Sequence, residues 1–155
     1  MADASTILRW IQESLDELEL SYDFGQSGDW IKTQIPLDGK LNSMTVHIHC
    51  AENRYMVNAF ISLDADADCR TQVSEYLMRA NYGLVHGNFE MDFSDGEIRF
   101  RLTVDCEDRT GLSETVVMRS LFIPKMMYEK YGDGLVAVMY GIKTPAEAVA
   151  DADGE

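Results

Sequence analysis

The chain has 155 residues, of which 27 are acidic and 13 are basic, so its formal net charge at pH 7 is -14. A charge of this sign repels a polyphosphate backbone and an anionic membrane surface, and no basic stripe in the sequence overcomes that repulsion. No apolar run reaches the roughly 18 residues that a membrane span requires. We therefore expect neither nucleic acid nor a membrane among the partners.

Length and hydrophobic content are typical of one compact domain, here residues 1–155. Hydrophobic residues make up 46% of the chain, and a chain of this size buries roughly 70% of its unfolded surface. The first ten residues, MADASTILRW, lack the pattern of a secretion signal. Cys50, Cys69 and Cys106 are odd in number and widely spaced, which is typical of buried free thiols and not of disulfides. We expect a cytosolic protein.

The first 37 residues predict a helix followed by a strand. An apolar stripe at helical spacing indicates an amphipathic helix from Ser5 to Leu20, formed by Leu8, Ile11, Leu15 and Leu18. A turn-rich segment over 23–29 ends it. A strand is expected over 30–37, and Pro36 confines its end to a sheet edge or a strand terminus.

The next segment predicts a β-hairpin that turns at Glu52 and Asn53. Pairing Ala51 with Arg54 gives one wholly apolar face, with Ile48 opposite Val57. The other face carries a mixed set of side chains: His47, His49, Met56, Asn58 and Phe60. We regard Met56 and Phe60 as candidates for contact with a protein partner.

An aspartate run follows this hairpin. Four carboxylates match ligand positions of a calcium-binding loop: Asp64, Asp66, Asp68 and Glu75. However, the position that needs glycine is Cys69, and strand-like residues precede the run where a helix is required. The competing interpretation is that these aspartates cap a second helix from Ala67 to Asn81.

The histidines suggest a metal site as an alternative. His47 and His49 project from one face of a strand, and His86 is available as a third ligand. No carboxylate or thiolate is fixed beside them, and no catalytic motif accompanies His86. We expect no enzymatic activity, no cofactor and no metal. The alternative is a metal-binding protein or metal-dependent enzyme that uses these histidines or the run from Asp64 to Asp68.

Residues 81–102, NYGLVHGNFEMDFSDGEIRFRL, predict a second hairpin. A two-residue type I′ turn at Asp95 and Gly96 is favoured by this residue pair. The resulting register pairs Phe93 with Ile98, Met91 with Phe100 and Phe89 with Leu102 on one side. On the other side it pairs Asp92 with Arg99 and Glu90 with Arg101.

A long helical pattern begins at Ser113. We expect a kink or break at Pro124 and a second joint at YGDG, residues 131–134. Thr144 predicts a capping box that starts a terminal helix, and the acidic tail is expected to fray from about residue 150.

The long helix is apolar on more than one side. The side chains concerned are Ile123, Met126, Met127, Tyr128 and Tyr131. One interpretation is a helix buried on two sides within the domain; the other is a subunit interface or a groove for a partner. Both remain open from the sequence.

Two motifs resemble those of the YbjN family of bacterial sensory-transduction regulators. The first is N-x-x-L-x-x-G-x-F-x-x-D, which spans Asn81 to Asp92 and is followed by DGEIRFR. The second is YG-x-x-x-P-x-E-A, which begins at Tyr140.

The resemblance implies an α+β fold like that of type III secretion chaperones. It implies an antiparallel sheet with flanking helices in the order α-β-β-β-α-β-β-α-α, and small, acidic, often dimeric proteins that bind other proteins. No catalytic residues are carried over. We expect a non-enzymatic domain with a regulatory or chaperone-like role in the bacterial cytosol, which forms a homodimer and binds a protein partner.

Overall fold

A six-stranded antiparallel sheet, in the order β1-β2-β3-β4-β6-β5, forms the centre of the computed structural model, which describes residues 1–154. Its strands are β1 (Asp23–Phe24), β2 (Trp30–Pro36), β3 (Ser43–Ala51), β4 (Arg54–Phe60), β5 (Asn88–Met91) and β6 (Ile98–Asp105). The helices are α1 (Ala4–Glu17), α2 (Arg70–Asn81), α3 (Glu114–Met139) and α4 (Pro145–Asp153). The predicted α+β class and element order are confirmed, and the short β1 is an addition to them.

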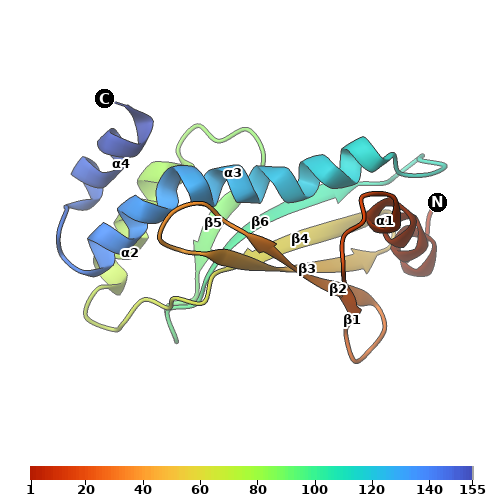
Figure 1. Ribbon diagram of the computed structural model, residues 1–155, viewed down its shortest axis with the longest axis horizontal. Coiled ribbons are helices and arrows are strands. Elements are labelled where there is room, and N and C mark those ends of the chain that lie inside the picture. Colours follow the sequence, from red (N-terminus) through yellow and green to blue (C-terminus); the bar gives the residue numbers. More distant parts are fainter. Residues whose placement is uncertain (155) are drawn as a thin grey trace.

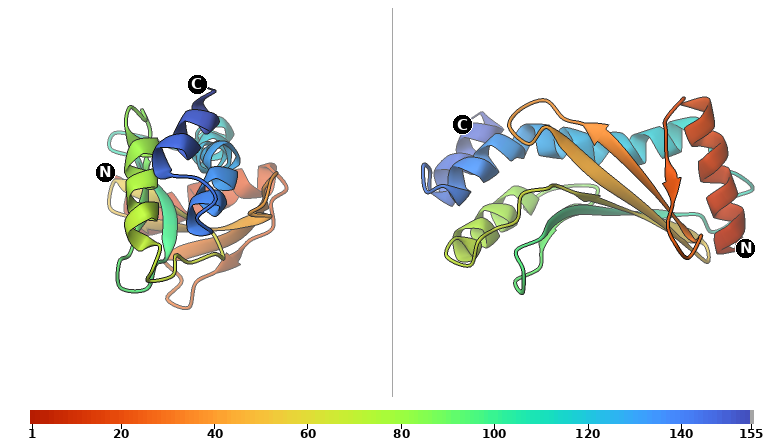
Figure 2. Two further views of the ribbon diagram at one scale, coloured as in Figure 1. Left: turned by 90° about the vertical axis from the view of Figure 1, so that its left-hand side faces the viewer. Right: turned by 60° about the horizontal axis from the view of Figure 1, so that its bottom comes forward.

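The long helix α3 runs along one face of the sheet, with α1 at one end of the molecule and α2 and α4 at the other (Figures 1 and 2). It contacts β4 and β6, while α1 contacts β3 and β4. The covered face supplies the core, which includes Ile31, Val46, Ile48, Val57 and Phe100. No helix within residues 1–154 is both long and apolar enough to cross a membrane.

The hairpin of β3 and β4 has the predicted register. Ala51 pairs with Arg54 and Ile48 pairs with Val57. Asn53 adopts a positive φ of 58°, which asparagine tolerates better than most residues. The local turn chemistry and the apolar alternation therefore agree, and together they fix this pairing.

The hairpin of β5 and β6 is shifted by two residues from the predicted register. Phe89 pairs with Phe100 and Met91 with Ile98, so the two-residue turn was wrong. The loop is wider, and Phe93 lies in it with 59% of its surface exposed. Because the shift is even, each strand keeps the predicted side chains on its buried face.

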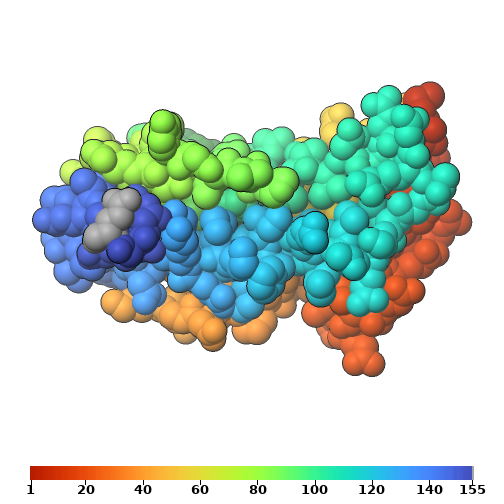
Figure 3. All heavy atoms as spheres, turned by 90° about the horizontal axis from the view of Figure 1, so that it is seen from above, coloured from red at the N-terminus to blue at the C-terminus, as the bar shows by residue number. Residues whose placement is uncertain are grey.

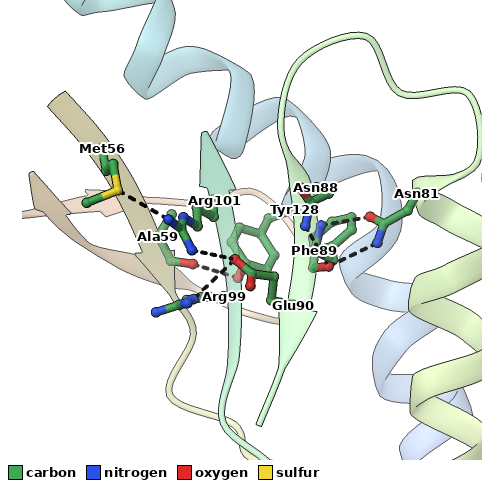
Figure 4. A network of polar contacts seen from close by, with 9 residues as sticks. All are labelled: Met56, Ala59, Asn81, Asn88, Phe89, Glu90, Arg99, Arg101 and Tyr128. Atoms are coloured by element: carbon green, nitrogen blue, oxygen red, sulfur yellow. Dashed lines mark hydrogen bonds and ion pairs between the residues drawn. The ribbon is translucent and has the colours of Figure 1, made fainter. Parts of the chain in front are cut away.

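The charges of this hairpin rearrange with the register. Glu90 lies 3.4 Å from Arg99 and 3.8 Å from Arg101, so the predicted Glu90–Arg101 pair is present (Figure 4). The predicted partner of Arg99 was wrong, because Asp92 instead accepts hydrogen bonds from the amide and hydroxyl of Ser94.

A side-chain bridge joins the end of α2 to β5. The amide of Asn81 accepts a hydrogen bond from the Phe89 N–H at 2.7 Å and donates one to the Phe89 carbonyl at 2.9 Å (Figure 4). Since β5 is an edge strand, this bridge occupies polar backbone groups that would otherwise face solvent.

The helix α3 is continuous from Glu114 to Met139 with Pro124 inside it. Of the expected kink or break at Pro124, the break was therefore wrong, and so was the joint at residues 131–134. The glycines there serve packing instead. A Cβ atom on Gly132 would lie 2.7 Å from Leu41, and one on Gly134 would lie 2.5 Å from the Tyr76 hydroxyl. Close approach of neighbouring elements, and not a turn, explains both glycines.

The other helices differ from expectation mainly at their ends. The helix α2 begins at Arg70, three residues later than predicted, and its N-cap residue, Cys69, makes no side-chain capping bond. The preceding aspartates therefore do not cap it. The capping box at Thr144 is confirmed, and α4 continues to Asp153, whose carboxylate lies 3.0 Å from the Lys130 ammonium.

Candidate functional site

A row of exposed apolar side chains runs along three successive turns of α3. Met118, Phe122 and Met126 are 47%, 50% and 41% exposed. Their spacing of four residues places them on one ridge of the helix. Figure 3 shows α3 crossing this face uncovered, between the segment of α2 and that of β2 and β3. An apolar row of this kind is typical of a contact surface.

An apolar groove of about 250 Å³ lies beside this row; we call it the α3 groove. Its apolar lining comes from three elements far apart in the sequence: Leu18, Leu20, Ile35, Pro36, Met118, Leu121 and Phe122. Lys125 lies at the rim, where its ammonium donates to the Pro36 carbonyl at 3.0 Å and pairs with Glu129 at 2.6 Å. The groove is therefore apolar inside and bounded by a fixed charge.

The structure separates the predicted α3 residues into two groups. Met126 is exposed, and Ile123 and Met127 are half-buried. Tyr128 and Tyr131 are 2% and 4% exposed, so they belong to the core of the domain.

Met118 and Phe122 were missed in the sequence. Continuing the four-residue spacing back from Met126 would have identified both.

Met56 and Phe60 lie on the sheet face that the helices leave open, as the predicted hairpin requires. This face holds an aromatic cluster in which the Trp30 ring lies 4.7 Å from His47 and 5.4 Å from His49. The His47 ring lies 5.0 Å from that of Phe60. Desolvation, followed by the charges of His49 and Lys32, lowers the pKa of His47. The lowered pKa favours the neutral form of His47, which fits an aromatic surface.

His86 lies apart from the other two histidines. The strands β4 and β6 separate β3 from β5, so His86, just before β5, is roughly 14 Å away across the sheet. It lines a pocket beside α3, whereas His47 and His49 project from the open face. Within residues 1–154, no three side chains of His, Cys, Asp or Glu are grouped so that they could hold a metal ion.

The aspartate run likewise shows no ligand geometry. Glu75, which a calcium loop would need as its last ligand, is turned to Arg79 on the same helix at 2.9 Å. The residues around Asp66 form a turn in which the Asp66 carbonyl accepts from the Cys69 N–H. These carboxylates therefore do not converge on one point.

No family model and no curated protein matches the sequence. Among solved structures, the chain is similar to YbjN from E. coli, a candidate transcription regulator, with a TM-score of 0.58 and 11% identity over 81% of this chain and 90% of that one. It also matches a chain of the HopA1–SchA chaperone–effector complex, with a TM-score of 0.48 and 14% identity over 91% of this chain and 97% of that one. The resemblance to YbjN expected from the sequence motifs is confirmed as a likeness of fold.

Proposed function

We propose that this chain is a non-enzymatic protein-binding domain with a regulatory or chaperone-like role, acting as a homodimer in the bacterial cytosol. The observation that carries the proposal is the exposed row of Met118, Phe122 and Met126 beside the α3 groove. Three large apolar side chains on one helix ridge cost solvation free energy unless a partner covers them.

The fold and the composition support the same proposal. The regulatory role follows the description of E. coli YbjN, whose fold this chain shares. Methionine and aromatic side chains adapt well to a protein surface and are enriched at interfaces. We propose that the partner inserts an apolar segment into the α3 groove. This segment comes either from a second copy of this chain or from another protein.

The proposal is tested with Phe122→Asp, using Met78→Asp as the matched control. Met78 is 70% exposed on α2, away from the groove, so both variants place a new charge on an exposed helix surface. Light scattering at micromolar concentration measures the oligomeric state, and affinity capture from the native host measures partner binding. We expect Phe122→Asp to lose dimer and partner, and Met78→Asp to retain both.

Thermal unfolding of both variants provides the control for folding. Both side chains are exposed, so each midpoint should stay close to that of the natural chain. If the natural chain is a monomer, and both variants capture the same partners as the natural chain, then the α3 groove is not the binding surface.

A further inference from the structure

A second pocket, of about 490 Å³, lies between β6 and the first half of α3. The strand β5 pairs with β6 only as far as Asn88 opposite Arg101, so the rest of β6 has no neighbouring strand on that side within residues 1–154. The space beside it is walled by α3 and by the loop before β5. The apolar side chains of this lining are Val85, Leu102, Val104, Val116 and Ile123.

The pocket also collects basic groups in a chain whose net charge is -14. Arg109, Arg119 and His86 line it, with Asp105 as the single carboxylate of the lining. The Nε–H of Arg109 donates to the backbone carbonyl of Asp105 at 2.9 Å, which leaves its terminal N–H groups available. Neither arginine forms an ion pair among residues 1–154.

The beginning of α3 adds to this positive potential. Thr115 and Val116, from the first turn of the helix, line the pocket. The helix runs for 26 residues, and its N-terminal end carries the positive end of the helix dipole, which the Glu114 carboxylate in the first turn partly offsets. The Val116 N–H is already bonded to the Ser113 side chain. The two guanidinium groups without ion pairs, beside apolar side chains, favour a ligand that is anionic at one end and apolar along its body.

We propose that this pocket binds an amphipathic organic anion, a carboxylate or phosphate monoester carried on an apolar body. Guanidinium groups bind such anions by paired, charge-assisted hydrogen bonds. The volume of about 490 Å³ falls in the range of small-molecule sites, about 300–1,000 Å³. Polar side chains, among them Thr103, Thr115 and Ser120, share the lining with the apolar ones. Arg109 and Arg119 hold the anionic group, and Val104, Val116 and Ile123 contact the apolar body.

This site is independent of the proposed protein-binding surface. The α3 groove lies on another side of the helix, and the two hollows share no lining residue. Loss of ligand binding and loss of partner binding are therefore separable by mutation.

Isothermal titration calorimetry with decanoate and with decyl phosphate, each below its micelle concentration, tests the proposal. Decylammonium is the matched cation, with the same chain and the opposite charge. We expect saturable binding of the anions at one site. Arg109→Gln and Arg119→Gln should each weaken it about tenfold, the effect of losing one charge-assisted hydrogen bond. Arg9→Gln, an exposed arginine on α1, is the control and should bind as the natural chain does.

A second variant tests the apolar part of the site without changing charge. Ile123→Trp fills the pocket and should abolish binding, while the melting midpoint reports whether the fold survives. The proposal is overturned if neither anion binds saturably, if decylammonium binds equally well, or if both arginine variants bind as the control does. It is also overturned if Phe122→Asp abolishes binding, since the ligand would then occupy the α3 groove.

Discussion

The hydroxyl of Tyr128 donates a hydrogen bond to the backbone carbonyl of Ala59 at 2.8 Å, across 69 positions of the chain. Both residues are buried, and the bond ties the middle of α3 to a central strand (Figure 4). A second phenol, that of Tyr55, donates a hydrogen bond at 3.0 Å to the hydroxyl of Ser120, which lies about two turns before Tyr128 on α3. Two buried polar contacts therefore set the position of α3 along the sheet, which apolar packing alone would leave less specific.

Tyr128→Phe should lower the free energy of unfolding by about 1–2 kcal/mol, because it removes the donor and leaves a buried carbonyl with one partner fewer. Urea denaturation measures the change. Tyr140→Phe is the control, since Tyr140 is 70% exposed and its change should stay within about 0.5 kcal/mol. Equal stability of the two variants would show that the Tyr128 bond contributes nothing.

Gly134→Ala should destabilise the protein although alanine is the better helix former by about 1 kcal/mol. The added methyl group would lie 2.5 Å from the Tyr76 hydroxyl oxygen, and Tyr76 is held there by its bond to the Tyr131 carbonyl. In a Tyr76→Phe background the nearest atom is gone, so the same substitution should cost less. A double-mutant cycle of unfolding free energies measures this coupling. Additive effects of Gly134→Ala and Tyr76→Phe on the unfolding free energy would contradict the close approach of Gly134 to the Tyr76 hydroxyl.

Asn81→Ala should cost about 1–3 kcal/mol of unfolding free energy, since one side chain satisfies both the N–H and the carbonyl of Phe89. Asn88→Ala, next to Phe89 on β5, is a suitable comparison because the Asn88 amide makes only a longer bond of 3.3 Å to the same carbonyl. Amide hydrogen exchange should show faster exchange of the Phe89 N–H in the first variant and not in the second. If the Phe89 N–H exchanges at the natural rate in both variants, the Asn81 bridge does not stabilise β5.

Stability should fall as the pH is lowered through the titration of His47. Desolvation and nearby positive charge lower its pKa in the folded protein below the ordinary value of about 6.5. At pH values above about 6.5, His47 is neutral in both the folded and the unfolded protein, so its titration does not lower the stability. Below it the unfolded chain takes up the proton first, so unfolding becomes more favourable until the folded pKa is passed. Melting midpoints of the natural chain should therefore drop more between pH 7 and pH 5 than those of His47→Gln, and parallel curves would contradict this.

The parts of the fold that were predictable are those set by local chemistry. The β3–β4 register follows from alternation and from one asparagine turn, and the α4 capping box follows from three neighbouring residues. The register of the β5–β6 hairpin does not follow from local chemistry, because a segment outside the hairpin fixes its loop. The Ala65 N–H donates to the Gly96 carbonyl, and a Cβ on Gly96 would lie 2.0 Å from the Ala65 carbonyl oxygen. A distant segment thus overrides the turn that the residue pair favours on its own.

The candidate contact surfaces were likewise predictable only where they lie on a single element. Met126 and the Met56–Phe60 face were identified from spacing along single elements. The α3 groove and the pocket beside β6 each draw on segments separated by tens of residues, so their linings appear only when the chain is folded. The burial of Tyr128 and Tyr131 has the same origin, since helical spacing cannot tell which of two apolar sides meets the sheet.

The Asn81 bridge has a consequence for the order of folding. It links residues eight positions apart, whereas the Tyr128 bond links residues 69 apart. The difference in loop-closure entropy favours the shorter contact by about 2 kcal/mol. We therefore expect α2 and the following hairpin to associate before α3 docks, so that Asn81→Ala slows refolding while Tyr128→Phe mainly speeds unfolding, as stopped-flow kinetics would measure. The same side chain that closes the sheet edge in the native state would then help to start its assembly.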